Sequence, residues 1–161
     1  MNVQFCRSTA LSVKETNKGA YMDENTASET ASLLYSTTTA LLSLLNTTNQ
    51  AVSQDEVNRI LEQPGGKLSA ASTVNGGKDR AAKLAASLQE NLFPSIPEQA
   101  KITGVILVIN YSGDMTTEEY LLISEHLLGK FPEDIHSIFS LCQNDSIANN
   151  FKGTLLVTWE T

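Results

Sequence analysis

The chain contains few of the features that small secreted proteins and membrane proteins depend on. Its 161 residues include only two cysteines and four prolines. Cys6 and Cys142 lie far apart and have no metal-ligand spacing, so we expect two free thiols in a reducing compartment. The longest strongly apolar run, GVILVI at residues 104–109, is too short to span a bilayer. The first residues show no basic leader or apolar signal core, so we expect a cytoplasmic protein that does not contact the membrane.

Positive charge is also scarce. Eleven Lys and Arg oppose eighteen Asp and Glu, which gives a formal net charge of −7. Proteins that grip a phosphate backbone concentrate Lys and Arg on one face, so nucleic acid is not an expected partner. Hydrophobic residues make up 41% of the chain, which is typical of a globular protein, and the length predicts one domain with one core.

Hydrophobic periodicity divides the first part of the chain into three segments. Residues 1–27 are predicted to be an N-terminal extension with a possible strand and a polar loop. Residues 28–46 carry apolar side chains at helical spacing and predict a long helix. The run Thr37, Thr38 and Thr39 has low helix propensity because of β-branching, so packing must hold this helix. Ser53 and Glu56 then match a capping box, which predicts a short helix from Gln54 to about Gln63.

The rest of the chain alternates strands and helices. Strand-like runs occupy residues 67–74, 102–110, 134–142 and 153–159, with helical patterns over 77–93 and from Thr116 onward. We expect an α+β fold: a mixed four-stranded sheet packed with helices and preceded by the long helix. The last two strands are predicted to form a hairpin.

Local motifs for catalysis or cofactor binding are not supported. The Gly76-Gly77-Lys78 run fails as a phosphate loop, because Ser72 stands where the motif needs glycine and Asp79 where it needs a hydroxyl. The run is better explained as a turn before a helix. The two histidines, His126 and His136, have no metal-ligand neighbours, and no nucleophile elbow occurs, so we expect no metal and no cofactor. Of the acids Asp114, Glu118, Glu119 and Glu125, three cluster at a helix start, where capping explains them better than acid–base catalysis does.

The order of these parts resembles the C-terminal half of FtsZ, the bacterial tubulin homologue, over roughly residues 28–160. The resemblance rests on GKDRA at residues 77–81 before an Ala-rich helix, and on a glycine-led apolar strand from Gly104. It also rests on SGD at residues 112–114 before the cap at 116–119, and on TLLVT at 154–158. The nucleotide-binding half of the family, with its Gly-rich signature, is missing from these residues.

The resemblance implies a role for the loop that follows the long helix. In the family, this loop presents acidic residues to the nucleotide of the next subunit. Glu56 matches one acidic position, but Ser53 stands where the other acid is expected, so we expect no catalytic residue and Glu56 only as a weak remnant. The predicted partner-binding residues are Asn49, Gln50, Ser53, Gln54, Asp55 and Glu56.

The implied function is therefore a non-enzymatic interaction module that docks on an FtsZ-like filament subunit or on its own kind, as in cell division or the cytoskeleton. One form is a filament cap, and another is a piece of a longer FtsZ-like protein. The alternative is an enzyme or small-molecule binder, because a similar architecture occurs in chorismate-mutase-like trimers. Arg7, Arg59 and Arg80 are the only arginines available for a site that binds carboxylates. A structural domain with an unknown partner is a third interpretation.

Overall fold

The computed structural model describes residue 37, residues 54–62, residues 66–112 and residues 114–161. The predicted extension 1–27 lies outside the described residues, as do Asn49, Gln50 and Ser53. The predicted helix over 28–46 also lies outside them except for Thr37, which is helical and buried. The capping box between Ser53 and Glu56 therefore stays a prediction.

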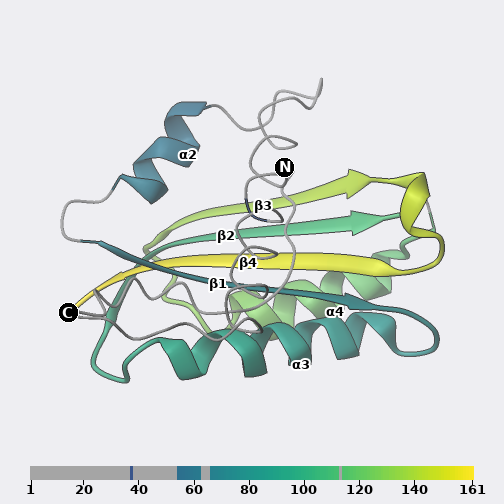
Figure 1. Cartoon of the computed structure of the whole chain (residues 1–161), viewed down its shortest axis with the longest axis horizontal. Helices are drawn as coiled ribbons and strands as arrows, with labels where there is room; N and C mark the ends of the chain where they lie inside the picture. Colours follow the sequence, from purple (N-terminus) through teal and green to yellow (C-terminus); the bar gives the residue numbers. More distant parts are fainter. Residues whose placement is uncertain (1–36, 38–53, 63–65, 113) are drawn as a thin grey trace, which may run out of the picture.

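The described elements follow the predicted alternation of helices and strands (Figure 1). The chain runs in order through α2 (Gln54–Leu61), β1 (Lys67–Asn75), α3 (Arg80–Leu92), the 3-10 turn η1 (Phe93–Ser95), β2 (Lys101–Tyr111), α4 (Thr117–Leu128), β3 (His136–Gln143), η2 (Asp145–Ile147) and β4 (Phe151–Glu160). The predicted α+β class with a mixed four-stranded sheet is confirmed.

The predicted hairpin between the last two strands is wrong. The strand order is β1-β4-β2-β3, so β2 lies between β3 and β4. β3 pairs parallel with β2, whereas β4 pairs antiparallel with both β1 and β2. The reason is burial: Gly153 to Trp159 are all buried, and a strand of that kind is favoured in the centre of a sheet, where both of its edges are paired.

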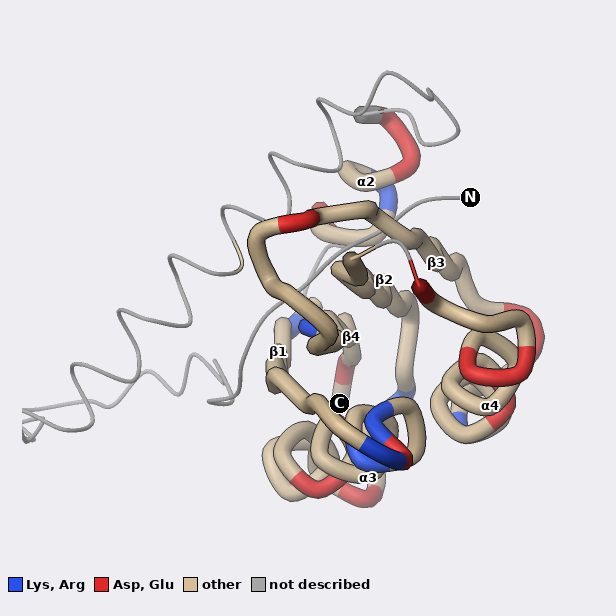
Figure 2. Tube along the Cα trace, turned by 90° about the vertical axis from the view of Figure 1, so that its right-hand side faces the viewer, with Lys and Arg blue, Asp and Glu red and all other residues tan. Residues whose placement is uncertain are grey.

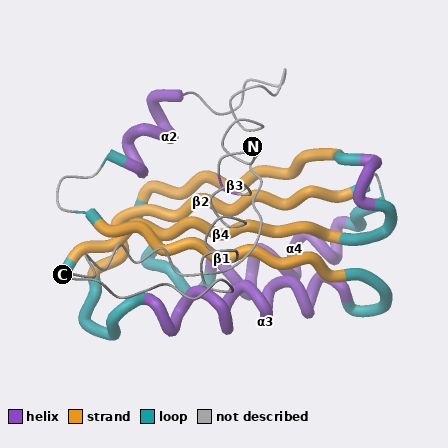
Figure 3. The backbone as a smooth tube through the Cα atoms, viewed as in Figure 1, coloured by secondary structure: helices purple, strands orange, loops and turns teal. Residues whose placement is uncertain are grey.

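The sheet is covered on both faces, which explains why β2 is a continuous apolar run (Figure 3). Val105, Leu107 and Ile109 face a large core with α3 and α4, whereas Ile106 and Val108 face a smaller core with α2. The view along the strands shows α2 on one side of the sheet and α3 and α4 on the other (Figure 2). Leu155, Val157 and Trp159 of β4 also belong to the larger core.

Residues close to the start of α3 and of α4 determine where each of these helices begins. The turn before α3 uses positive φ at Gly77 and Asp79, so the helix begins at Arg80, three residues later than predicted. At α4, the Thr116 side chain accepts from the Glu119 backbone N–H and the Glu119 carboxylate accepts from the Thr116 N–H, which confirms the predicted capping box. Ile123 and Leu127 of α4 are buried, and Tyr120 and Leu128 are partly buried against the same core.

Candidate functional site: the outer side of α2 and an arginine cluster

Two apolar side chains hold α2 against the sheet. Val57 is 3% exposed and Ile60 is 1% exposed, and both belong to the smaller core. Gly104 of β2 lies beneath Ile60: a Cβ at this position would come within 2.8 Å of both Ile60 Cγ2 and Thr158 Oγ1. The lack of a side chain at Gly104 therefore lets α2 approach the strand closely.

Because Val57 and Ile60 pack against the sheet, the polar side of α2 is exposed. Asp55, Glu56, Arg59 and Glu62 are all exposed, and α2 ends at Leu61, two residues before the predicted end. Asp55, Asn58, Arg59 and Glu62 line an open hollow of about 390 Å³. Of the predicted partner-binding residues, the structure thus places Asp55 and Glu56 side by side in the exposed first turn of α2, and Gln54 begins this helix.

The first turn of α2 is chemically suited to charged contacts. Two adjacent carboxylates at a helix N-terminus interact favourably with the helix dipole while they remain open to solvent. Arg59 adds one cation to the same hollow. Such a surface can form ion pairs and hydrogen bonds with a complementary protein.

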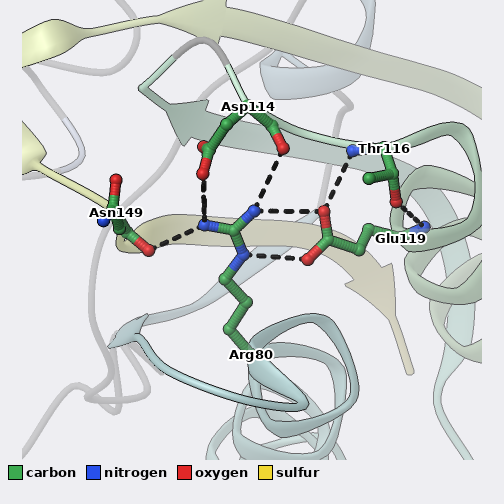
Figure 4. A network of polar contacts seen from close by, with 5 residues as sticks. All are labelled: Arg80, Asp114, Thr116, Glu119 and Asn149. Atoms are coloured by element: carbon green, nitrogen blue, oxygen red, sulfur yellow. Dashed lines mark hydrogen bonds and ion pairs between the residues drawn. The ribbon is translucent and has the colours of Figure 1, made fainter.

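The second polar cluster surrounds Arg80 and was missed by the sequence analysis (Figure 4). The Arg80 Nε donates to Glu119 Oε1 at 2.8 Å, and Nη2 donates to Glu119 Oε2 at 3.1 Å, which makes a bidentate pair. The Arg80 Nη1 donates to the Asn149 carbonyl at 2.8 Å and to Asp114 Oδ2 at 3.2 Å. The Nη2 also donates to the Asp114 carbonyl at 3.2 Å.

Burial strengthens these contacts. The Arg80 side chain is 11% exposed, and its guanidinium lies 3.9 Å from the ring centroid of Phe151. Hydrogen bonds to Glu119 raise the pKa of Arg80 above its usual value, against the opposing effect of burial. The hydrogen bond from Arg80 correspondingly lowers the pKa of Glu119, and burial opposes this shift. The cluster ties the first residue of α3 to α4 and to the two loops that contain Asp114 and Asn149.

The acids predicted to be caps have separate roles. Glu119 is a cap, as expected, but it also binds Arg80, and Asp114 is an ion-pair partner rather than a cap. Glu118 and Glu125 are exposed. Arg80 precedes Leu84 and Leu88 at helical spacing on the buried side of α3. An arginine on an apolar stripe is the sequence signal from which a buried ion pair could have been predicted.

The two histidines, His126 and His136, both lie at exposed positions. His126 has a ring nitrogen 2.9 Å from the Leu122 carbonyl, and His136 is exposed at the start of β3. In the part of the chain that the structure describes, no three His, Cys, Asp or Glu side chains gather as a metal site would require. None of the described helices combines the length and apolar character needed to cross a bilayer. Burial raises the pKa of the Cys142 thiol, and Cys142 is a free cysteine.

Solved structures similar to this chain are structures of FtsZ. The W319Y mutant of FtsZ from M. jannaschii matches with a TM-score of 0.67 at 13% identity, over 89% of this chain and 43% of that one. The empty FtsZ dimer from the same organism matches with a TM-score of 0.69 at 16% identity, over 85% of this chain and 40% of that one.

The chain therefore spans about two fifths of the length of the FtsZ chains that it matches. No family model matches the sequence, and no curated protein matches it. At these identities the similarity shows the fold alone. The chain has an FtsZ-like fold, with a mixed four-stranded sheet between α2 on one face and α3 and α4 on the other.

Proposed function

We propose that this chain is a non-enzymatic interaction module that docks on an FtsZ-like subunit or on a second copy of itself, with a role in cell division or the cytoskeleton. The docking surface comprises residues 49–56 and the exposed side of α2. The observation that carries the proposal is the FtsZ-like fold together with two exposed carboxylates, Asp55 and Glu56, in the first turn of a helix that is seated on the sheet.

The α2 surface has the properties of a charged protein-docking surface. Val57 and Ile60 fix the helix, so its exposed side keeps one orientation and loses little conformational freedom on binding. Asp55 and Glu56 favour a partner surface that offers cations or hydrogen-bond donors. The resemblance of the sequence to the C-terminal half of FtsZ supports a contact between this part of the chain and a neighbouring subunit.

The non-enzymatic character rests on the missing second acid. Phosphoryl transfer depends on accurate placement of the attacking water, and Glu56 is the only acid at the two matched loop positions, since the other is Ser53. One carboxylate in the first turn of a helix is a poor substitute for a pair that positions water. Docking, in contrast, depends on complementarity over the whole interface.

The alternative of a carboxylate-binding site is not favoured by the Arg80 cluster. Each of the three guanidinium nitrogens of Arg80 already donates to Asp114, Glu119 or the Asn149 carbonyl. A ligand carboxylate would have to displace two protein carboxylates to reach this side chain. In the proposed function, Arg80 therefore stabilises the fold and does not bind a ligand.

The proposal is tested by mixing the chain in stoichiometric excess with a polymerising FtsZ and measuring the pelleted polymer. We expect the polymer mass to fall, because a docked unit without a nucleotide site ends the filament. Charge reversal by Asp55→Lys with Glu56→Lys should abolish the effect. The matched control is Glu90→Lys with Glu98→Lys, which reverses two exposed acids away from α2.

Sedimentation velocity of the chain alone tests the self-association form of the proposal. The same charge-reversed variant should shift any dimer toward monomer, and the control should not. Unchanged polymer mass, together with a monomeric chain at high concentration, would contradict the proposed function.

A further inference from the structure

We propose that Asn75 is a site of covalent modification: its side-chain amide is lost by cyclisation onto the Gly76 nitrogen, which leaves aspartate or isoaspartate at the end of β1. This inference goes beyond the proposed function and does not rest on it. The α2 helix lies over Gly104, at the opposite end of the strands from Asn75 (Figure 1).

The residue that follows an asparagine decides how easily the ring closes. Ring closure brings the following backbone nitrogen onto the side-chain carbonyl carbon, and a side chain on that following residue hinders the approach. Glycine has no Cβ and adopts backbone conformations that other residues avoid. Asn75 is the one asparagine in the sequence that glycine follows. The other described asparagines precede Arg, Leu, Tyr, Asp, Asn or Phe, so Asn75 is the most reactive by this criterion.

The structure places the Asn75-Gly76 dipeptide where strand pairing ends. Asn75 is the last residue of β1, and the register with β4 ends at the pair Asn75 and Phe151. The amide that attacks the side chain is therefore the first one beyond the paired strand. Gly77, the next residue, is exposed and has a φ of 75°. Asn75 and Gly76 are themselves partly exposed, so water has access to the reacting groups.

Packing explains why glycine occupies position 76. The side-chain oxygen Oδ1 of Asn150 fills the space that a Cβ on Gly76 would need. Any other residue at position 76 would displace the Asn150 side chain, which lies just before β4. The contact thus requires the same glycine that makes Asn75 reactive.

The reaction needs water and no other reactant. The Gly76 nitrogen forms a bond to Cγ of Asn75 and passes its proton through water to Nδ2. The bond between Cγ and Nδ2 breaks, and Nδ2 leaves as ammonia. One water molecule then opens the succinimide ring. Opening at the side-chain carbonyl gives aspartate, and opening at the main-chain carbonyl gives isoaspartate.

Both products change the local contacts. The new carboxylate adds one negative charge to a chain whose formal net charge is −7. The Nδ2 of Asn75 donates to Thr73 Oγ1 at 3.2 Å, whereas a carboxylate only accepts, so the Thr73 hydroxyl must turn to donate. Isoaspartate also lengthens the backbone by one carbon opposite Phe151, whose ring lies against the Arg80 guanidinium. We expect isoaspartate at this position to loosen that contact and to destabilise the fold.

The test is peptide mapping of the folded chain during incubation at mildly alkaline pH. Trypsin releases residues 68–78 as one peptide that contains Asn75, and mass spectrometry separates its asparagine, aspartate and isoaspartate forms. The comparison residue is Asn149, an exposed loop asparagine that another asparagine follows. We expect Asn75 to react at least about tenfold faster than Asn149, which corresponds to a barrier lower by about 1.4 kcal/mol. An isoaspartate methyltransferase with a labelled methyl donor measures isoaspartate independently.

Two variants separate the reaction from its consequence for stability. Asn75→Gln keeps an amide but must close a larger ring, so the reaction should stop. Asn91→Gln, at an exposed position of α3, is the matched control and should leave the rate at Asn75 unchanged. Circular dichroism checks that both variants fold. After incubation, the parent chain and Asn91→Gln should unfold at lower urea concentration than before, whereas Asn75→Gln should not.

Gly76→Ala combined with Asn150→Ala tests the role of the glycine directly. The second change removes the side chain that a Cβ at position 76 would meet, so the fold should be retained. The new methyl group should slow the loss of the Asn75 amide at least about tenfold, which corresponds to a barrier higher by about 1.4 kcal/mol.

Two results would overturn the inference. The first is an Asn75 that reacts no faster than Asn149 in the folded chain; loss confined to the urea-unfolded chain would mean that strand pairing protects it. The second is equal stability of the parent chain and Asn75→Gln after incubation. Neither result bears on the α2 surface, which co-sedimentation with FtsZ tests separately.

Discussion

Arg80 is the single side chain with the most polar contacts among the described residues. Its guanidinium binds two carboxylates and a backbone carbonyl and lies over Phe151, although no basic or acidic pattern in the sequence pairs these positions. The contacts span 34 to 69 residues of sequence, so they form only when α3, α4 and the loops have packed. Removal of the guanidinium would leave Glu119 partly buried without its cation.

Replacement of this side chain should destabilise the protein. Arg80→Met is expected to lower the free energy of unfolding by about 2–3 kcal/mol, because a partly buried carboxylate loses its partner. Arg80→Lys should cost less, since the charge is retained but the bidentate geometry is lost. Urea denaturation measures the effect. Lys83→Met, an exposed control one turn later, should change stability by less than about 0.5 kcal/mol.

The lowered pKa of Glu119 predicts how stability depends on pH. Its carboxylate stabilises the folded state above the ordinary pKa of 4.5, and that contribution is lost as the pH falls through the lower pKa of the folded state. Glu119→Gln keeps a capping-box residue but removes the charge. The variant should therefore be less stable at neutral pH, and its deficit should shrink below pH 4.5.

Denaturant midpoints across this pH range test the prediction. Glu118→Gln, at the exposed neighbouring position, should show no comparable convergence with the parent chain at low pH. A deficit of Glu119→Gln that stays constant with pH would mean that the charge pair with Arg80 does not stabilise the fold.

Of the three described α-helices, α2 is the shortest, and two buried side chains hold it against the sheet. Only Val57 and Ile60 of this helix are fully buried, and they lie against a strand that has no side chain at Gly104. The helix is short, and short helices depend on packing for their stability. The orientation of Asp55 and Glu56 therefore depends on this one contact.

Addition of a methyl group beneath α2 should release it. Gly104→Ala is expected to cost about 1–3 kcal/mol by overpacking, because the new Cβ meets Ile60 and Thr158. Hydrogen exchange should show faster exchange in α2 while β2 and β4 stay protected. The double variant with Ile60→Ala should cost less than the sum of the two single changes, since it removes one clashing group. Additive costs would contradict this account of the contact.

At the scale of the whole molecule, neighbouring strands of the sheet are not consecutive in the sequence. β4, the last strand, inserts between β1 and β2, and α3 and α4 cover the face opposite α2. This arrangement matches that of FtsZ over 85–89% of the chain.

The chain by itself should not take up guanine nucleotide tightly. The Gly76-Gly77-Lys78 run forms a turn that leads into α3, and its last residue, Lys78, is exposed. Equilibrium dialysis with GTP and magnesium measures uptake, with a polymerising FtsZ as the positive control. A dissociation constant in the micromolar range would contradict the proposed non-enzymatic function.

The sequence was sufficient to predict the class of fold and most of its elements. Periodicity located β2 and the helices, and the Thr116 cap located the start of α4, because these signals come from residues close together in the chain. The short helix that begins at Gln54 was also predicted from neighbouring residues. Small errors, such as the later start of α3, arise at turns where backbone conformation overrides the apolar pattern.

The amino-acid sequence by itself determined where helices and strands form and which of their sides are apolar, since both follow from local propensity and spacing. Only the tertiary structure decided the strand order, the contacts of Arg80 and the close approach of α2 at Gly104. These features depend on competition between distant segments for the same buried positions. A strand buried on both faces, such as β4, stabilises the sheet most at its centre, whatever its place in the chain.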